Sequence, residues 1–158
     1  MDIATALSLN GKTVQPDDLT CCPIRLVKEF LHAFAFYESK MAAHVGHFID
    51  DHFLIDCAGD PQQMPFAGRW QGIEGLDQWV RSYFNVLMHP QKDFYKPEFF
   101  FRDNTVVAWG QDWAHTPNLP FPPIWVSQKF EFAAGKLVYF ENRFDTGSRS
   151  RHLARAEA

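Results

Sequence analysis

The sequence predicts an α+β domain in which three helices come first along the chain and pack on a strongly curved, mostly antiparallel sheet. Two observations carry this prediction. Apolar residues recur at helical spacing up to about residue 88, and from about residue 94 the pattern changes to the two-residue alternation of strands. Helices followed by strands are typical of an α+β layout, with the helices gathered on one side of the sheet.

Three helices are expected in the first half of the chain. The first begins near Pro23, which suits a first helical turn, and the second, shorter one begins at Ser39. The third follows Gly72 and ends at His89-Pro90. Their inner faces carry apolar residues at i, i+3, i+4 and i+7 offsets: Ile24, Val27, Leu31 and Phe34; Met41, Val45, Phe48 and Ile49; and Leu76, Trp79, Val80, Tyr83, Phe84, Leu87 and Met88.

The strands are read from alternation and turn residues. One early strand is expected near residues 53–57, and three or four antiparallel strands follow residue 94. Asp103-Asn104 and Ala134-Gly135 mark turns between these later strands. The clearest strand segments are residues 106–115, 124–133 and 137–145.

Each of these three later strands has an apolar face that one amide interrupts. The amides are Gln111, Gln128 and Asn142. A three-residue loop at 134–136 would place Gln128 opposite Asn142, and symmetric closure of the loop TPNLPFPP would place Gln111 opposite Gln128. A polar row of this kind indicates either a lined pocket or a dry polar network, of which we favour the pocket. The side chains that share these faces are Val107, Trp109, Trp113 and His115; Ile124, Val126, Phe130 and Phe132; and Val138, Phe140 and Phe144.

Length and charge limit the classes of protein that need to be considered. The 158 residues suffice for one domain, expected over residues 20–147, with a polar leader at 1–19 and a basic tail at 148–158. The formal net charge is −4, and the basic residues do not form a block, so neither nucleic acid nor an anionic membrane is an expected partner. No apolar stretch approaches the roughly 20 residues of a membrane-spanning helix.

The cysteines and histidines indicate neither a disulfide framework nor a metal site. Cys21, Cys22 and Cys57 are too few for a disulfide scaffold, and without a signal peptide the expected location is the reducing cytoplasm. Cys57 is interpreted as a small buried apolar residue. The histidines at 44, 47 and 52 do not complete a ligand set, so we expect no metal and no other cofactor.

Asp56 stands out because it ends an apolar run, FLID, with no compensating charge beside it. A carboxylate buried without a partner costs several kcal/mol or changes its pKa. The residue is therefore a candidate for a functional acid or base.

Three segments together carry a resemblance to a known family. The segments ESKMAAHVGHFIDDHFLID, GDPQQMPFAGRWQGIEGLDQWVRSYF and GKLVYFENRFDT, in this order after a first helix, resemble the SnoaL-like branch of the NTF2-like superfamily. This branch includes ketosteroid isomerase, scytalone dehydratase and limonene epoxide hydrolase. The resemblance covers roughly residues 22–146. It implies a bent sheet wrapped around helices to form a cone, and a homodimer formed through the outer face of the sheet.

The resemblance also assigns roles to individual residues. Asp56 corresponds to the proton-transferring base of ketosteroid isomerase, and Gln128 to the residue there that donates to the oxyanion. Asn142 corresponds to a catalytic Asp of limonene epoxide hydrolase. His32 stands where ketosteroid isomerase has a Tyr, and Trp113 stands where the epoxide hydrolase has a carboxylate. His115 is a candidate second proton carrier, and the remaining expected pocket residues are Trp109, Gln111, Trp113 and Phe130.

Two functional classes follow from these assignments. The first is a cofactor-independent acid–base enzyme that isomerises, cyclises or dehydrates a small hydrophobic carbonyl compound, polyketide-like or steroid-like. The second is a module that binds a small ligand or dimerises without chemistry, because one fold hosts both functions.

Overall fold

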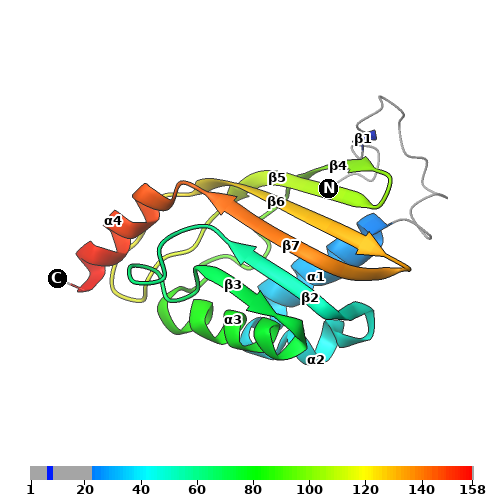
Figure 1. Ribbon diagram of the computed structural model, residues 1–158. Helices are drawn as coiled ribbons and strands as arrows, with labels where there is room; N and C mark the ends of the chain where they lie inside the picture. Colours follow the sequence, from blue (N-terminus) through cyan, green and yellow to red (C-terminus); the bar gives the residue numbers. More distant parts are fainter. Residues whose placement is uncertain (1–6, 9–22, 158) are drawn as a thin grey trace.

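The computed structural model describes residues 7–8 and 23–157 as one curved sheet with helices packed on it (Figure 1). The sheet has seven strands in the order β1-β4-β5-β6-β7-β2-β3. Helices α1, α2 and α3 lie on one face of the sheet, and α4 extends from one end (Figure 1). The strands are β1 (Leu7–Ser8), β2 (Ile49–Cys57), β3 (Gly68–Gln71), β4 (Glu98–Arg102), β5 (Thr105–Asp112), β6 (Ile124–Ala133) and β7 (Lys136–Phe144). The α-helices are α1 (Pro23–Tyr37), α2 (Ala42–Val45), α3 (Gly72–Val86) and α4 (Thr146–Glu157).

The first and third predicted helices are confirmed, and the second is shorter and irregular. Short 3₁₀ turns at Glu38–Lys40 and Gly46–Phe48 flank α2, and Ile49 already begins β2 instead of completing a helical face. The leader, with Cys21 and Cys22, lies outside the described residues except for β1. Among the described helices, none is long and apolar enough to cross a membrane.

The β6–β7 hairpin has the predicted pairing but reaches it in a different way. Its loop has two residues, Ala134 and Gly135, both with positive φ (50° and 76°), which is the geometry of a type I′ turn. A bulge after Glu131 then shifts the register by one residue. The turn and the bulge together place Gln128 opposite Asn142, as predicted.

The predicted register between β5 and β6 is wrong. Gln111 lies opposite Trp125, and Gln128 lies opposite Ala108. The loop does not close symmetrically, because a bridge between His115 and Met88 binds the chain to the segment after α3. The row of three amides is therefore a pair, and Gln111 lies on the outer face of the sheet.

Small residues, not the tryptophans, form the inner face of β5. Ala108 and Gly110 are buried there, whereas Trp109 is 41% exposed on the outer face. The space is limited on the inside: a Cβ atom on Gly110 would lie 3.0 Å from Cα of Pro97 and 3.3 Å from the ring of Tyr95. The heavy aromatic face of this strand is consequently outside the core.

The core lies between the inner face of the sheet and the helices. Phe30 of α1 contacts Phe130 of β6 and Phe140 of β7, with ring centroids 5.4 and 5.1 Å apart. From α3, Trp79 packs edge-on against Phe140 at 5.5 Å. These aromatic rings fill this part of the interior.

The segment that the sequence assigns to a basic tail is helix α4. Its first turn is fixed by Asp145, whose Oδ1 accepts a hydrogen bond from the backbone N–H of Ser148 at 2.9 Å. Two side chains of the helix are buried against the domain, Arg149 and Leu153. The helix is therefore part of the fold.

Candidate functional site

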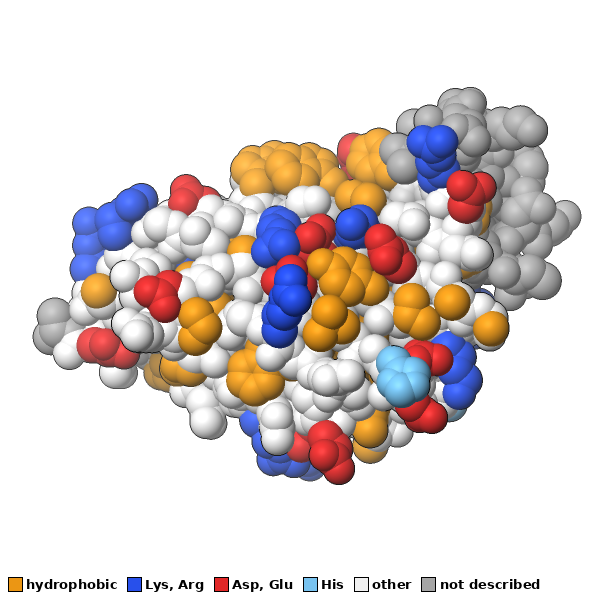
Figure 2. Space-filling model, in the orientation of Figure 1, with side chains coloured by type: hydrophobic (Ala, Val, Ile, Leu, Met, Phe, Trp, Pro, Cys, Tyr) orange, Lys and Arg blue, Asp and Glu red, His pale blue; other side chains and the backbone are white. Residues whose placement is uncertain are grey.

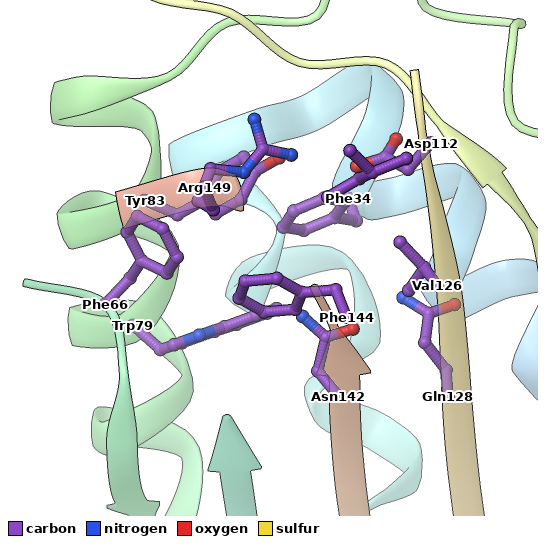
Figure 3. A pocket seen from close by; sticks show the side chains of 11 residues that line it. Phe34, Phe66, Trp79, Tyr83, Asp112, Val126, Gln128, Asn142, Phe144 and Arg149 are labelled. Atoms are coloured by element: carbon purple, nitrogen blue, oxygen red, sulfur yellow. The ribbon is translucent and has the colours of Figure 1, made fainter. Parts of the chain in front are cut away.

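Two small cavities lie side by side between the sheet and the helices, and they share three wall residues, Phe34, Asp112 and Gln128. Each has a volume of about 30 Å³, enough for one or two water molecules. Figure 3 shows the first cavity. Its other walls are Phe66, Trp79, Tyr83, Ile124, Val126, Asn142, Phe144 and Arg149. The second is completed by Leu31, Ala35, His89, Gln91, Lys92 and Tyr95.

Asp112 is the one carboxylate among the described residues that lines either cavity. It is the last residue of β5 and shares the inner face of that strand with Ala108 and Gly110. Its side chain is 21% exposed, so one end of the site reaches solvent. A carboxylate at this position can accept a proton from a molecule in either cavity.

A histidine and a tyrosine adjoin this carboxylate. Nε2 of His89 lies 3.7 Å from Oδ1 of Asp112 and 3.1 Å from the hydroxyl of Tyr83, which projects from α3. Burial lowers the pKa of His89 below its usual value, and only 7% of its side chain is exposed, so the imidazole is neutral at pH 7. Burial, with a contribution from Asp112, raises the pKa of Tyr83 well above 10. The tyrosine is therefore a permanent hydrogen-bond donor.

The two inward amides provide neutral hydrogen-bonding groups. Oε1 of Gln128 accepts a 2.6 Å hydrogen bond from the hydroxyl of Tyr95, which leaves the NH₂ group of Gln128 free to donate. Nδ2 of Asn142 lies 3.8 Å from Sγ of Cys57, and burial raises the pKa of that thiol to about 11. Oδ1 of Asn142 and Nε1 of Trp79 are buried without a partner among the described residues. Unpartnered buried polar atoms are costly unless a ligand or water satisfies them.

Asp56 does not line either cavity. In β2 it alternates with Ile55 and Cys57, which are buried, so its side chain lies on the outer face of the sheet, contrary to the expected orientation at a pocket wall. There, Oδ2 of Asp56 lies 3.1 Å from Nη2 of Arg143 and 3.4 Å from the hydroxyl of Tyr139. These partners compensate the charge that stood out in the sequence.

The other predicted site residues lie apart from one another. Trp109 and Gln111 are exposed on the outer face, and Phe130 is fully buried among core rings. Nε1 of Trp113 donates a hydrogen bond to the carbonyl oxygen of Phe121. Nδ1 of His115 lies 2.7 Å from the carbonyl oxygen of Thr116. His32 is exposed on α1 and stacks on Phe36. Of the nine predicted residues, the structure brings two together in a cavity, Gln128 and Asn142.

Sequence reasoning missed most of the charged and protic groups of the site: Tyr83, His89, Tyr95, Asp112 and Arg149. For Asp112 a signal was present, because it shares one strand face with Val106, Ala108 and Gly110. A strand face of small residues fits closely under a helix, and that indicates the inner side. Arg149 offered no such signal within a segment of alternating Ser and Arg.

No cluster of three or more His, Cys, Asp or Glu side chains suited to a metal ion occurs within residues 23–157. The groups that line the two cavities can transfer protons and form hydrogen bonds. A carboxylate, a neutral imidazole, a protonated phenol and two amides line the two adjoining cavities. This set is suited to moving a proton on a bound molecule and to stabilising an oxyanion.

No protein-family model and no curated protein sequence matches the chain. Solved structures do. An NTF2-like protein of unknown function from Burkholderia pseudomallei has 17% sequence identity and a TM-score of 0.67, over 82% of this chain and 95% of that one. A putative isomerase from Rhodopseudomonas palustris has 15% identity and a TM-score of 0.66, over 85% and 94%. An LEH-like epoxide hydrolase from M. tuberculosis has 17% identity and a TM-score of 0.57, over 85% and 90%.

The chain has the NTF2-like fold, as the sequence predicted. At these identities the likeness concerns the fold, and function has to be argued from the site itself.

Proposed function

We propose that this protein is a cofactor-independent acid–base enzyme that acts on a small hydrophobic carbonyl compound in the cavity beside Asp112. The observation that carries the proposal is the position of Asp112, the single carboxylate at walls that, among the described residues, otherwise consist of apolar side chains, neutral hydrogen-bonding groups and the two cations Lys92 and Arg149. Asp112 takes the role of base that the family resemblance gave to Asp56.

In the proposed reaction, Asp112 removes a proton from the carbon next to the carbonyl group. The C–H electron pair moves into the carbonyl, and the resulting enolate oxygen accepts hydrogen bonds from neutral donors. The available donors are the NH₂ group of Gln128 and the hydroxyl of Tyr83. Return of the proton to another atom completes an isomerisation; attack on a second carbonyl gives a cyclisation, and loss of hydroxide gives a dehydration.

His89 and Tyr95 act as positioning residues in this scheme. His89 contacts both Asp112 and Tyr83, and therefore fixes the acid and the donor relative to each other. Tyr95 holds the oxygen of Gln128 and so directs its NH₂ group. Donors that are held in place before the reaction stabilise a developing charge at low reorganisation cost.

The size of the cavities constrains the substrate. Typical sites for small organic molecules occupy about 300–1,000 Å³, an order of magnitude more than either cavity. Phe34 lines both cavities, and even together the two cavities stay far below that range. A polyketide-like or steroid-like molecule therefore requires movement of Phe34 and of other wall side chains, whereas a single-ring carbonyl compound requires a smaller movement.

The test is exchange of α-protons for deuterium. Phenylacetone in D₂O serves as a small hydrophobic carbonyl probe, and NMR follows loss of its α-proton signal with and without the protein. We expect catalysed exchange that falls at least about 100-fold in Asp112→Asn, the usual contribution of a general base. Asp77→Asn, an exposed carboxylate of α3, is the matched control and keeps the parent rate. Loss of exchange in Asp56→Asn with retention in Asp112→Asn would overturn the proposal.

The second candidate function is binding of a small ligand without chemistry. Oδ1 of Asn142 and Nε1 of Trp79, which have no partner among the described residues, favour it, because a bound ligand can satisfy such buried polar atoms without any reaction. The exchange assay separates the two functions: a binding module broadens the NMR signals of phenylacetone without accelerating exchange, and Asp112→Asn then behaves as the parent protein does.

We also propose that two copies associate through the outer face of the sheet. On this face Trp109 and Trp125 are 41% and 52% exposed and stack on each other, with ring centroids 4.8 Å apart. Figure 2 shows hydrophobic side chains gathered over β5 and β6, beside a group of basic and acidic side chains. Large exposed apolar groups with a polar rim are typical of contact surfaces between proteins.

A further inference from the structure

Arg149 is a buried cation without a carboxylate partner. Its side chain enters from the first turn of α4 and lines the first cavity, and the residue is only 3% exposed. A guanidinium has five N–H donors. Among the described residues the guanidinium makes one hydrogen bond, from Nη1 to the carbonyl oxygen of Ala114 at 3.0 Å. Its Cζ atom lies 5.8 Å from the ring centre of Phe121.

The free charge of Arg149 is unusual for a folded chain. Arginine is almost never fully buried unless it is paired, because an unpaired charge loses its hydration. Asp112 lines the same cavity, yet it forms no salt bridge with Arg149; its nearest basic neighbour is Nε2 of His89 at 3.7 Å. Figure 3 shows both side chains in the upper part of the cavity, with Asn142 and Gln128 below. The cavity thus presents a base and a cation as two separate groups.

We infer that the molecule bound in this cavity carries an anionic oxygen group, a carboxylate or a comparably acidic enol, that pairs with Arg149. This inference rests on the proposed function and names the substrate class of the same site. A planar carboxylate can take two parallel N–H groups of a guanidinium, and such charge-assisted bonds are about twice as strong as neutral ones. The carbonyl group and its acidic C–H would then lie toward Asp112 and Gln128.

The surroundings of Arg149 are consistent with this role. The side chain of Asp145 caps the first turn of α4, and its backbone carbonyl oxygen accepts the N–H of Arg149 at 3.1 Å, so the backbone from which the arginine extends is held in place. Two further arginines of α4, Arg151 and Arg155, are at least partly exposed near the same end of the molecule. Figure 2 shows basic side chains gathered at that end. Basic groups around an opening raise the local concentration of anions.

The experiment compares anionic and neutral probes of equal size. Benzoate and benzamide form one pair, and acetate and acetamide form a smaller pair; binding is measured by NMR titration in low-chloride buffer at pH 7. We expect benzoate to bind the parent protein at least about tenfold more tightly than benzamide, and Arg149→Gln to abolish this preference. Arg149→Lys retains part of it because the charge remains. Arg102→Gln, an exposed arginine of β4 that lines neither cavity, is the matched control and keeps the full preference.

Equal affinity of the parent for the anionic and neutral probes, or an unchanged preference in Arg149→Gln, would overturn the inference. If Arg149→Gln does not fold, the preference for benzoate over benzamide is compared between the parent protein and Arg149→Lys, and that comparison tests the inference. Its failure is distinguishable from failure of the proposed function. Asp112→Asn keeps Arg149 and loses a like charge near the bound anion, so it retains or strengthens benzoate binding whatever its effect on proton exchange.

Discussion

At the scale of single residues, Asp56 and Asp112 show how strand parity decides which carboxylate lines a cavity. Both carboxylates lie at or next to the end of a strand, one residue from buried neighbours. Asp56 alternates with the buried Ile55 and Cys57 and therefore lies outside, whereas Asp112 continues the buried face of Ala108. A shift of one residue exchanges the two faces of a strand. The apolar run before Asp56 drew attention to it, yet apolar residues occupy both sides of that strand.

The burial of His89 predicts a pH-dependent stability. Burial lowers the pKa of His89 from the usual 6.5 in the folded state. As the pH falls, the histidine is therefore protonated more readily in the unfolded chain, and this protonation favours the unfolded state. Asp112 and Glu38 partly oppose this shift, and Arg149 and Lys92 add to it. The free energy of unfolding should therefore be at its full value above pH 6.5 and decrease below it, by at most about 1.4 kcal/mol per pH unit from this group.

Urea unfolding at several pH values between 5 and 8 measures this effect. His89→Gln keeps a side chain that can hydrogen-bond with Tyr83, and it should show a shallower decrease below pH 6.5 than the parent protein. Some decrease remains, because burial also lowers the pKa of His152. An identical slope in parent and variant would show that His89 is protonated alike in both states.

At the scale of elements, close packing over β5 explains why the aromatic face of that strand was assigned to the wrong side. The side chain of Trp109 has more apolar surface than those of Ala108 and Gly110 together. The hydrophobic pattern therefore predicts that the face with Trp109 points to the core. The structure puts Tyr95 and Pro97 directly over Gly110, where no larger residue fits. Steric limits of this kind depend on segments distant in sequence and are not visible in the strand itself.

Gly110→Ala should therefore destabilise the domain and disturb the site. The new methyl group would lie 3.0 Å from Cα of Pro97 and push Tyr95 away from Gln128. We expect a loss of about 1–3 kcal/mol in the free energy of unfolding, the usual cost of overpacking. The measurement is thermal or urea unfolding, together with the exchange of phenylacetone protons, which should also slow.

The matched control for this substitution is Gly46→Ala. Gly46 has a helical φ of −56°, and a Cβ atom there would meet its nearest side chain, Ile73, at an ordinary 3.7 Å. This change should be neutral or stabilising, by up to about 1 kcal/mol, because alanine is the better residue in a helical conformation. Equal losses for the two glycines would mean that packing over β5 is not the cause.

At the scale of the whole molecule, much of the fold could be predicted and much of the site could not. The order of elements, the starts of α1 and α3 and the pairing of Gln128 with Asn142 follow from local periodicity and turn chemistry. The cavity, in contrast, is made of groups from α1, α3, β5, β6, β7 and α4. Their meeting depends on long-range registers, and one of these, between β5 and β6, was predicted wrongly.

Association of two copies is the prediction that belongs to this scale. If the outer face forms the contact, replacing Trp109 and Trp125 together by Ser should convert a dimer into a monomer in analytical ultracentrifugation. Replacing the exposed Ile73 of α3 by Ser is the control, because it lies on a helix away from this face. A parent protein that sediments as a monomer at high concentration would contradict the prediction.

The attachment of α4 has a consequence for the order in which the molecule is completed. During synthesis the ribosome releases β7 before α4, and segments that emerge earlier can fold earlier. The sheet and the three other helices can thus assemble around Asp112 before Arg149 arrives. Under the proposed function, a nascent chain at that stage would have its base in place before its cation arrives, so the proposed preference for anionic molecules would be acquired only when α4 docks.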